Sequence, residues 1–204
     1  MQSYSLDVQG HTQLLKNGEE YQVMMQWEKP WMEACVDHLK PQKTDDILEI
    51  GFGLGYSATQ FQKYHPRTHT IVECDDTVLE KLREWAQDKP NVIIKKGFWQ
   101  NVLPSLGKFD AIFMDDFPLD AGGNTSQMLQ QSFRGKIFIE MCAESHLKPG
   151  ARLSTFATRS MKHLISHPKL SITEHFIKVL VPPNCTYMPS GENIVNIPLI
   201  KYLG

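Results

Sequence analysis

From residue 46 onward, the chain alternates short apolar runs with stretches in which apolar residues recur every three to four positions. The apolar runs predict strands at DILEI (46–50), HTIVEC (69–74), VIIKKG (92–97), FDAIFMD (109–115) and ARLSTFA (151–157). The periodic stretches predict helices at SATQFQKY (57–64), at VLEKLREWA (78–86) and from about residue 127 to residue 146. Strands that alternate with helices predict right-handed βαβ crossovers and a parallel sheet with helices on both faces.

The last third of the chain departs from this alternation. The apolar runs HFIKVLV (175–181) and NIVNIPLIKY (193–202) are joined by the turn-rich stretch VPPNCTYMPSGE, with no helix between them. Two strands joined in this way pair antiparallel at the edge of a sheet. The predicted fold is therefore α/β, a single doubly wound, mostly parallel, seven-stranded Rossmann-like sheet with an antiparallel C-terminal edge strand.

The N-terminal region is less clearly patterned. The first two dozen residues are polar, and we expect an irregular or short helical arm there. Helical spacing of apolar residues extends over 23–39, but Pro30 interrupts it, so we expect the helix to begin near that residue. With 204 residues, 41% of them hydrophobic, the chain has the size of one domain. We expect one domain over 1–204, in which 1–40 form an N-terminal arm or lid and a lead-in helix.

Composition and charge narrow the range of partners. Lys and Arg total 21 against 23 Asp and Glu, a formal charge of -2, which lacks the basic excess of a nucleic-acid-binding protein. The four cysteines and eight histidines match neither a disulfide framework nor a metal site. The sequence shows no signal peptide and no apolar run long enough to span a bilayer. We expect a cytoplasmic monomer or homodimer that binds a small molecule, and neither metal, nucleic acid nor membrane.

The first predicted strand runs into a glycine-rich turn. Gly51, Gly53 and Gly55 follow the strand and precede a helix, where the backbone must bend sharply and let a ligand approach closely. The spacing is G-x-G-x-G, and the stricter dinucleotide pattern G-x-G-x-x-G fails because residue 56 is Tyr. Gly51 and Gly53 are therefore candidate cofactor-binding residues.

Acidic residues near this turn point to a nucleoside cofactor. Glu73 ends the second strand and is placed to accept hydrogen bonds from both hydroxyl groups of a ribose. Nicotinamide dinucleotides and S-adenosylmethionine both fit that arrangement. Glu49 lies two residues before the glycine turn, where it would repel a pyrophosphate but attract an amino or sulfonium cation. This position favours S-adenosylmethionine as the cofactor, with S-adenosylhomocysteine as the product.

The ends of the second and third strands offer further cofactor contacts. Gly97, Phe98 and Trp99 follow the third strand, where the aromatic rings either stack on adenine or belong to the core. Cys74 follows Glu73, and we expect it to pack near the cofactor without chemistry of its own.

The fourth strand ends in two acids, Asp115 and Asp116. Ligands of open α/β sheets bind beyond the carboxyl ends of the strands, so these acids project toward the same crevice as the glycines. Together with Phe117 and Pro118, they suggest a rigid, negatively charged lip. Asp115 is the candidate for chemistry, whereas Asp116 fits a helix cap or a solvated turn.

Five stretches of the chain resemble one known family. They are MQWEKPWM (25–32), LEIGFG (48–53), IVECDD (71–76), DDFPL (115–119) and LVPPNCTY (180–187). Together they resemble guanidinoacetate N-methyltransferase and its relatives that methylate guanidino groups, within the class I S-adenosylmethionine-dependent methyltransferases. The W-E-x-P-[YW]-M and D-x-[FY]-P-L patterns carry most of the specificity of this resemblance, which covers most of the chain from residue 23 onward.

The resemblance implies roles for individual residues. By it, Glu28 clamps the guanidino group, while Asp115 contacts the cofactor, orients the attacking nitrogen and can take its proton. The residues that it implies for acceptor binding also include Met24, Trp27, Met32, Thr158 and Arg159. Arg159 either clamps an anionic tail of the acceptor or is simply solvated.

A pair of acids suits methylation of a guanidino group. A guanidinium is planar, cationic and a poor nucleophile, because its lone pairs are delocalised. One carboxylate can fix its plane through two parallel hydrogen bonds, while a second localises electron density on one nitrogen and accepts its proton. We therefore expect methyl transfer from S-adenosylmethionine to a small molecule such as guanidinoacetate. The alternatives are methylation of arginine, free or in a peptide, a non-catalytic protein that binds S-adenosylmethionine, and an NAD-dependent oxidoreductase.

Overall fold

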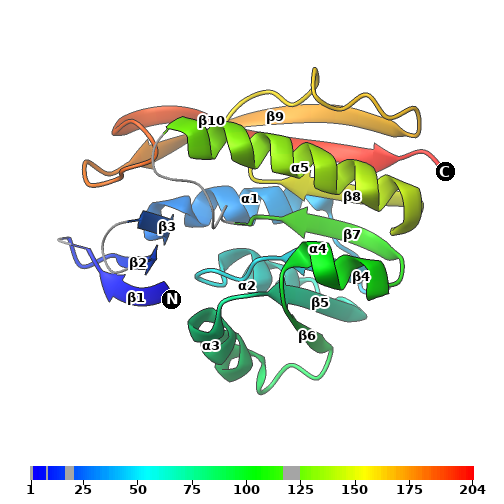
Figure 1. The fold of residues 1–204 in the computed structure, drawn as a ribbon, viewed down its shortest axis with the longest axis horizontal. Coiled ribbons are helices and arrows are strands. Elements are labelled where there is room, and N and C mark those ends of the chain that lie inside the picture. The colour runs from blue at the N-terminus through cyan, green and yellow to red at the C-terminus, as the bar shows by residue number, and fades with distance from the viewer. Residues whose placement is uncertain (1, 8, 17–20, 117–124) are drawn as a thin grey trace.

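A seven-stranded sheet forms the centre of the computed structural model, which describes residues 2–7, 9–16, 21–116 and 125–204 (Figure 1). Its strands stand in the order β6-β5-β4-β7-β8-β10-β9. Their bounds are β4 Asp46–Ile50, β5 Thr68–Glu73, β6 Val92–Lys96, β7 Phe109–Met114, β8 Leu147–Thr155, β9 Leu170–Val181 and β10 Gly191–Tyr202. Strands β4 to β8 are parallel, and β10 runs antiparallel to both β8 and β9. The predicted fold class is confirmed.

Helices cover both faces of this sheet. The α-helices are α1 Lys29–Leu39, α2 Tyr56–Lys63, α3 Asp76–Ala86, α4 Trp99–Val102 and α5 Thr125–Ser145, and two short 3-10 helices are η1 Gln26–Glu28 and η2 Leu103–Ser105. Neighbouring residues of β4 point to opposite faces: Ile47 packs in a core cluster with α1, α2 and α3, and Leu48 packs in a second cluster with α4 and α5. Burial on both faces explains why the central strands appear in the sequence as unbroken apolar runs.

The N-terminal region is a small antiparallel sheet of β1 (Gln2–Leu6), β2 (Thr12–Lys16) and β3 (Tyr21–Met25). The prediction of an irregular or short helical arm is therefore wrong. Short strands such as these are stabilised by what they pack against more than by their own sequence pattern. Here Leu14 and Met24 are buried and belong to the same core cluster as α1. Helix α1 itself begins next to Pro30, as predicted.

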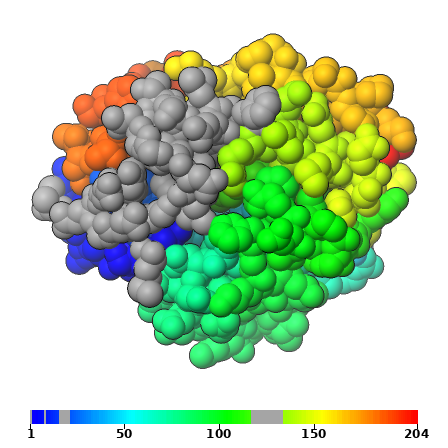
Figure 2. Space-filling view, in the orientation of Figure 1, coloured from blue at the N-terminus to red at the C-terminus, as the bar shows by residue number. Residues whose placement is uncertain are grey.

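The small sheet is fastened to the carboxyl ends of the main strands. The hydroxyl group of Tyr4 donates to the carbonyl oxygen of Gly53 at 2.8 Å, in the turn after β4. Strand β3 also holds the loop between β9 and β10, because the side-chain amide of Gln22 donates to the carbonyl oxygen of Asn184 at 2.8 Å. Figure 2 shows the N-terminal strands (dark blue) and this loop (orange) on the same side of the molecule. Residues from both ends of the chain therefore meet over one edge of the sheet.

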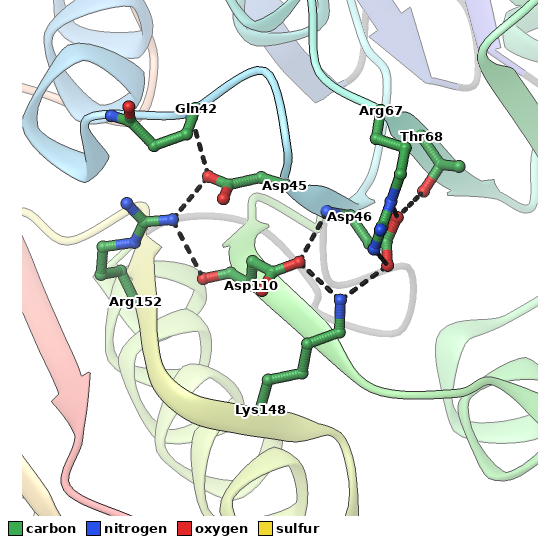
Figure 3. A network of polar contacts seen from close by, with 8 residues as sticks. All are labelled: Gln42, Asp45, Asp46, Arg67, Thr68, Asp110, Lys148 and Arg152. Atoms are coloured by element: carbon green, nitrogen blue, oxygen red, sulfur yellow. Dashed lines mark hydrogen bonds and ion pairs between the residues drawn. The ribbon is translucent and has the colours of Figure 1, made fainter.

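An ionic network ties the opposite ends of three strands together (Figure 3). The ammonium group of Lys148 in β8 lies 2.6 Å from the carboxylates of both Asp46 and Asp110, at the beginnings of β4 and β7. Beside it, Arg152 pairs with Asp45 at 2.5 Å. These contacts fix the amino ends of the strands and leave the carboxyl ends for ligands.

Candidate active site

The glycine turn follows β4 as predicted, and each of its glycines has a positive φ. The values are 83° at Gly51, 51° at Gly53 and 72° at Gly55, in the region that favours glycine. A Cβ at Gly51 would lie 2.2 Å from the carbonyl oxygen of Asp115, and a Cβ at Gly53 would lie 2.9 Å from the sulfur of Met24. The absence of side chains thus lets β3, the glycine turn and the end of β7 meet.

A cavity of about 310 Å³ lies at this meeting point. The residues proposed from the sequence that line it are Met24, Glu28, Gly51, Gly53, Glu73, Cys74, Gly97, Phe98, Trp99 and Asp115. They come from the small sheet, from η1, from the glycine turn, from the carboxyl ends of β5, β6 and β7, and from the start of α4. The structure therefore brings these residues together, and their roles in binding and catalysis stay predictions.

Glu73 is anchored at the end of β5. Its carboxylate accepts the backbone N–H groups of Cys74 at 2.7 Å, of Asp75 at 2.9 Å and of Phe52 at 3.0 Å. Burial raises the pKa of Glu73, and these hydrogen bonds oppose that shift. Burial and the nearby charges of Glu73 and Asp75 raise the pKa of Cys74 to about 12, so its thiol stays protonated near neutral pH and is not a nucleophile.

Glu28 and Asp115 lie in the wall of the same cavity. Glu28 is only 2% exposed, and its Oε1 accepts the backbone N–H of Met25 at 2.7 Å and the hydroxyl group of Tyr187 at 2.5 Å. Burial raises the pKa of Glu28 to about 7, although both hydrogen bonds lower it. The pKa of Asp115 is raised well above its ordinary value, first by burial and then by the charge of Glu28. Two acids that disfavour each other's charge form a site for a cation.

Asp116 belongs to the cavity wall, and its side chain is only 11% exposed, which does not fit a solvated turn. Its Oδ2 accepts the indole N–H of Trp99 at 2.8 Å and pairs with the guanidinium group of Arg134. The ring of Trp99 is nearly buried and meets the ring of Phe138 edge-on, with 5.2 Å between the centroids. Phe98, in contrast, is 51% exposed. Trp99 therefore belongs to the core, while Phe98 presents aromatic surface at the cavity.

Glu49 is absent from the described lining of the cavity, and its role as a cofactor contact stays a prediction. It is fully buried; the hydroxyl group of Ser57 donates to one of its oxygens, and Nε2 of His69 lies 2.8 Å from the other. Side chains alternate along a strand, so Glu49 points to the same face as Ile47, toward α2, and its charge contributes to the raised pKa of Asp115 at the end of β7. Its contacts brace the helix that follows the glycine turn.

Met32 and Trp27, which the family resemblance implies for acceptor binding, are not among the described residues that line the first cavity. Met32 is fully buried in the core. Trp27 packs against Trp31 and Tyr187, with ring centroids 6.3 and 6.0 Å apart. Its ring lines a second hollow, of about 810 Å³, which shares no described lining residue with the first. Direct contact of Met32 or Trp27 with an acceptor in the first cavity is therefore not supported.

Two residues implied on the other side of the site are also displaced from it. Thr158 and Arg159 are missing from the described lining of the first cavity. Arg159 is exposed, and its carbonyl oxygen accepts the side-chain amide of Asn196 at 2.9 Å, which agrees with the solvated alternative. Phe117 and Pro118 of the predicted lip lie outside the described residues.

Tyr187 and Arg134 are among the residues of the cavity wall that were not assigned from the sequence. Tyr187 ends the LVPPNCTY stretch, so that stretch carried a signal for it. Arg134 lies in α5, and nothing in the helical pattern of that segment indicates a partner in Asp116.

Comparison with known proteins identifies the family to which the chain belongs. The model of the family described as guanidinoacetate N-methyltransferase matches residues 9–197. The chain belongs to the guanidinoacetate N-methyltransferase family. Within and around this family, its curated relatives include protein arginine N-methyltransferase 2 of Candida glabrata and of Saccharomyces cerevisiae, which are 41% and 39% identical to it over 105 residues. Each match covers 47% of this chain but 25% and 26% of those relatives, so the chain spans about a quarter of their length.

Solved structures agree on the fold of this family member. Spermidine synthase in complex with the transition-state analogue AdoDATO has a TM-score of 0.62 at 17% identity, with 95% of this chain and 66% of that chain covered. An O-methyltransferase from Bacillus cereus in complex with SAH has a TM-score of 0.59 at 14% identity, with 85% and 80% covered. These similarities concern the fold, and the family match is what places the chain in the guanidinoacetate N-methyltransferase family.

The cavity fits S-adenosylmethionine by the chemistry of its wall. The glycine turn leaves space that a Cβ would fill, Glu73 presents an anchored acceptor for ribose hydroxyl groups, and Phe98 offers an exposed ring for adenine. The described residues contain no group of three or more side chains arranged to hold a metal ion. Among them, no helix is both long enough and apolar enough to cross a membrane.

Proposed function

We propose that this methyltransferase transfers a methyl group from S-adenosylmethionine to a guanidino nitrogen. The observation that carries the proposal is that Glu28 and Asp115, which come from distant parts of the sequence, line the same cavity as the glycine turn. When bound, S-adenosylmethionine supplies an electrophilic methyl group and leaves as neutral S-adenosylhomocysteine.

The two acids divide the work on the acceptor. Glu28 is held through Oε1, and its other oxygen, Oε2, accepts a hydrogen bond from the guanidino group and orients that group. Asp115 accepts the proton of the attacking nitrogen, and its raised pKa brings it closer to that of a base that works near neutral pH. Both carboxyl groups have raised pKa values, so a guanidinium between them favours the ionised form of each.

Arginine, free or within a peptide, is the acceptor that these observations favour over guanidinoacetate. The curated relatives are named as protein arginine N-methyltransferases. Guanidinoacetate also carries a carboxylate, which requires donors or a cation of its own. Arg159, the candidate for that contact, is exposed and outside the described cavity wall, and Arg134 is already paired with Asp116.

A mass-spectrometric screen of guanidinoacetate, free arginine, agmatine and arginine-containing peptides tests the proposal. Addition of one methyl group to any of them, dependent on S-adenosylmethionine, supports guanidino methylation, and the preferred compound identifies the acceptor class. Binding of S-adenosylmethionine with no product from any guanidine would contradict the proposal and favour a non-catalytic binding protein.

Substitution of Asp115 tests its assigned role. Asp115→Asn removes the base, so we expect a loss of turnover of about a hundredfold or more, with S-adenosylmethionine binding retained. Asp76→Asn is the matched control, because Asp76 is exposed and pairs only with Lys96 among the described residues. Turnover of Asp115→Asn at the wild-type rate would show that Asp115 is not the base.

A further inference from the structure

Tyr187 connects the C-terminal part of the chain to the acid that faces the acceptor. It lies in the loop between β9 and β10, lines the cavity, and donates its hydroxyl hydrogen to Oε1 of Glu28 at 2.5 Å. Its ring also meets the ring of Trp27, with 6.0 Å between the centroids. The ring contact and the hydrogen bond together fix the hydroxyl group next to the carboxylate.

Both hydrogen bonds to Glu28 reach the same oxygen. The backbone N–H of Met25 and the hydroxyl group of Tyr187 donate to Oε1, and no described residue donates to Oε2. A carboxylate turns about its Cγ–Cδ bond unless its surroundings hold it. Two donors on one oxygen define the rotation of the group and leave the other oxygen for a ligand.

We propose that Tyr187 is a positioning residue for the acceptor: its hydroxyl group holds Oε1 of Glu28 so that Oε2 meets the guanidino group. The proposal rests on the proposed guanidino methylation. It adds that the orientation of the Glu28 carboxylate is set by a residue in the loop between β9 and β10, far from Glu28 in the sequence. Tyr187 acts through Glu28, to which its hydroxyl group donates directly.

The loop that carries Tyr187 is tied to the strand that leads to Glu28. The side chain of Gln22 in β3 donates to the carbonyl oxygen of Asn184 and accepts the backbone N–H of Thr186, both at 2.8 Å. Strand β3 ends at Met25, just before η1 places Glu28. The donor hydroxyl and the carboxylate that accepts it therefore share one rigid support.

The hydrogen bond from Tyr187 to Glu28 can be measured through the pKa of Glu28, because the other ionisable groups around Glu28 are known. Those that interact with Glu28 are Tyr187, Asp115, Tyr56 and Cys185. The pKa of Tyr187 is raised well above its ordinary value and that of Tyr56 to about 12, so both stay protonated near neutral pH. The hydrogen bond from Tyr187 lowers the pKa of Glu28, so its loss shifts the titration of Glu28 to higher pH.

The test is Tyr187→Phe, which keeps the ring and removes only the hydroxyl group. Tyr64→Phe is the matched control, because the Tyr64 hydroxyl donates to Asp37 at 2.7 Å, outside the described cavity wall. With the best acceptor of the screen, we expect Tyr187→Phe to lower kcat/KM about tenfold to a hundredfold, with S-adenosylmethionine affinity unchanged. In the pH profile of kcat/KM, the loss of activity at low pH, which reflects protonation of Glu28, begins at a higher pH in Tyr187→Phe than in the wild type. Neither effect appears in Tyr64→Phe.

A second readout needs no acceptor. In urea unfolding at several pH values, Tyr187→Phe makes the loss of stability with rising pH larger, and this extra loss disappears in the Glu28→Gln background. Unchanged acceptor kinetics and an unchanged acid limb in Tyr187→Phe would overturn the positioning role. If the extra loss of stability with rising pH persists in the Glu28→Gln background, Tyr187 does not act through Glu28. If the wild-type enzyme methylates no guanidine, the proposed function itself fails, whatever the unfolding profile shows.

Discussion

Replacing Glu28 with Gln should make this protein more stable while removing its clamp for the acceptor. Glu28 is 2% exposed, and burial raises its pKa from 4.5 to about 7. Between these two pH values the folded protein holds a proton on Glu28 that the unfolded chain has released. The free energy of unfolding therefore falls as the pH rises through this window, because protons bind more to the folded state.

The size of the effect follows from the shift. A rise from 4.5 to about 7, at about 1.4 kcal/mol per pKa unit, corresponds to about 3 kcal/mol of stability lost above the window. Gln cannot ionise, and its carbonyl oxygen can still accept the hydrogen bonds from Met25 and Tyr187. A neutral side chain at this position also removes a charge that disfavours ionisation of Asp115. Both changes favour the variant at high pH.

Urea unfolding of the wild type and Glu28→Gln, without acceptor and from about pH 5 to about pH 8, measures this difference. We expect similar stabilities near the lower pH and an advantage for the variant that grows to about 3 kcal/mol at the upper pH. Glu84→Gln is the control, because Glu84 is exposed and pairs with Lys81 on the surface. A difference that does not vary with pH, or a variant that is less stable at the upper pH, would refute the reasoning from burial.

Two further substitutions test the frame of the site. Lys148→Met removes the ammonium group shared by two aspartates at 2.6 Å (Figure 3), and we expect urea unfolding near neutral pH to show a loss of about 1–3 kcal/mol. A loss within experimental error would show that the network contributes no stability. Gly51→Ala places a Cβ 2.2 Å from the carbonyl oxygen of Asp115, so calorimetry should show S-adenosylmethionine binding weakened by about tenfold or more. Gly107→Ala, which meets nothing within 4 Å, is its control, and equal affinity of the two variants would contradict the close approach.

The main sheet could be predicted because its physics is local. Parallel strands buried on both faces require unbroken apolar runs, and Ile47 and Leu48, which enter opposite core clusters, belong to one of them. The small N-terminal sheet could not be predicted in the same way. Its strands have five residues each and depend on contacts such as the hydrogen bond from Tyr4 to Gly53, 49 positions along the chain.

In the candidate site, too, some positions follow from the local sequence pattern and others depend on contacts between distant parts of the chain. Gly51, Gly53 and Glu73 could be placed at the cavity from the sequence, because ligands of open α/β sheets bind beyond the carboxyl ends of the strands. Glu49 was placed near the cofactor from its position alone, because sequence spacing does not show its contact with His69 on the next strand. Strand alternation does indicate which face it points to, because Glu49 shares the parity of Ile47, which faces the helices. Tyr187 became visible only when the loop that carries it was seen against Glu28.

The small sheet joins the side of the cavity proposed for the donor to the side proposed for the acceptor. Met24, near the end of β3, packs against Gly53 in the glycine turn, and Glu28 follows it by one turn of η1. Gln22, on the same strand, holds the loop of Tyr187, which holds Glu28. A shift of β3 would therefore move the wall of the donor site and the clamp for the acceptor at the same time. Because transfer requires the two reacting groups to be aligned within a fraction of an ångström, one rigid strand that sets both positions is an effective way to keep that alignment.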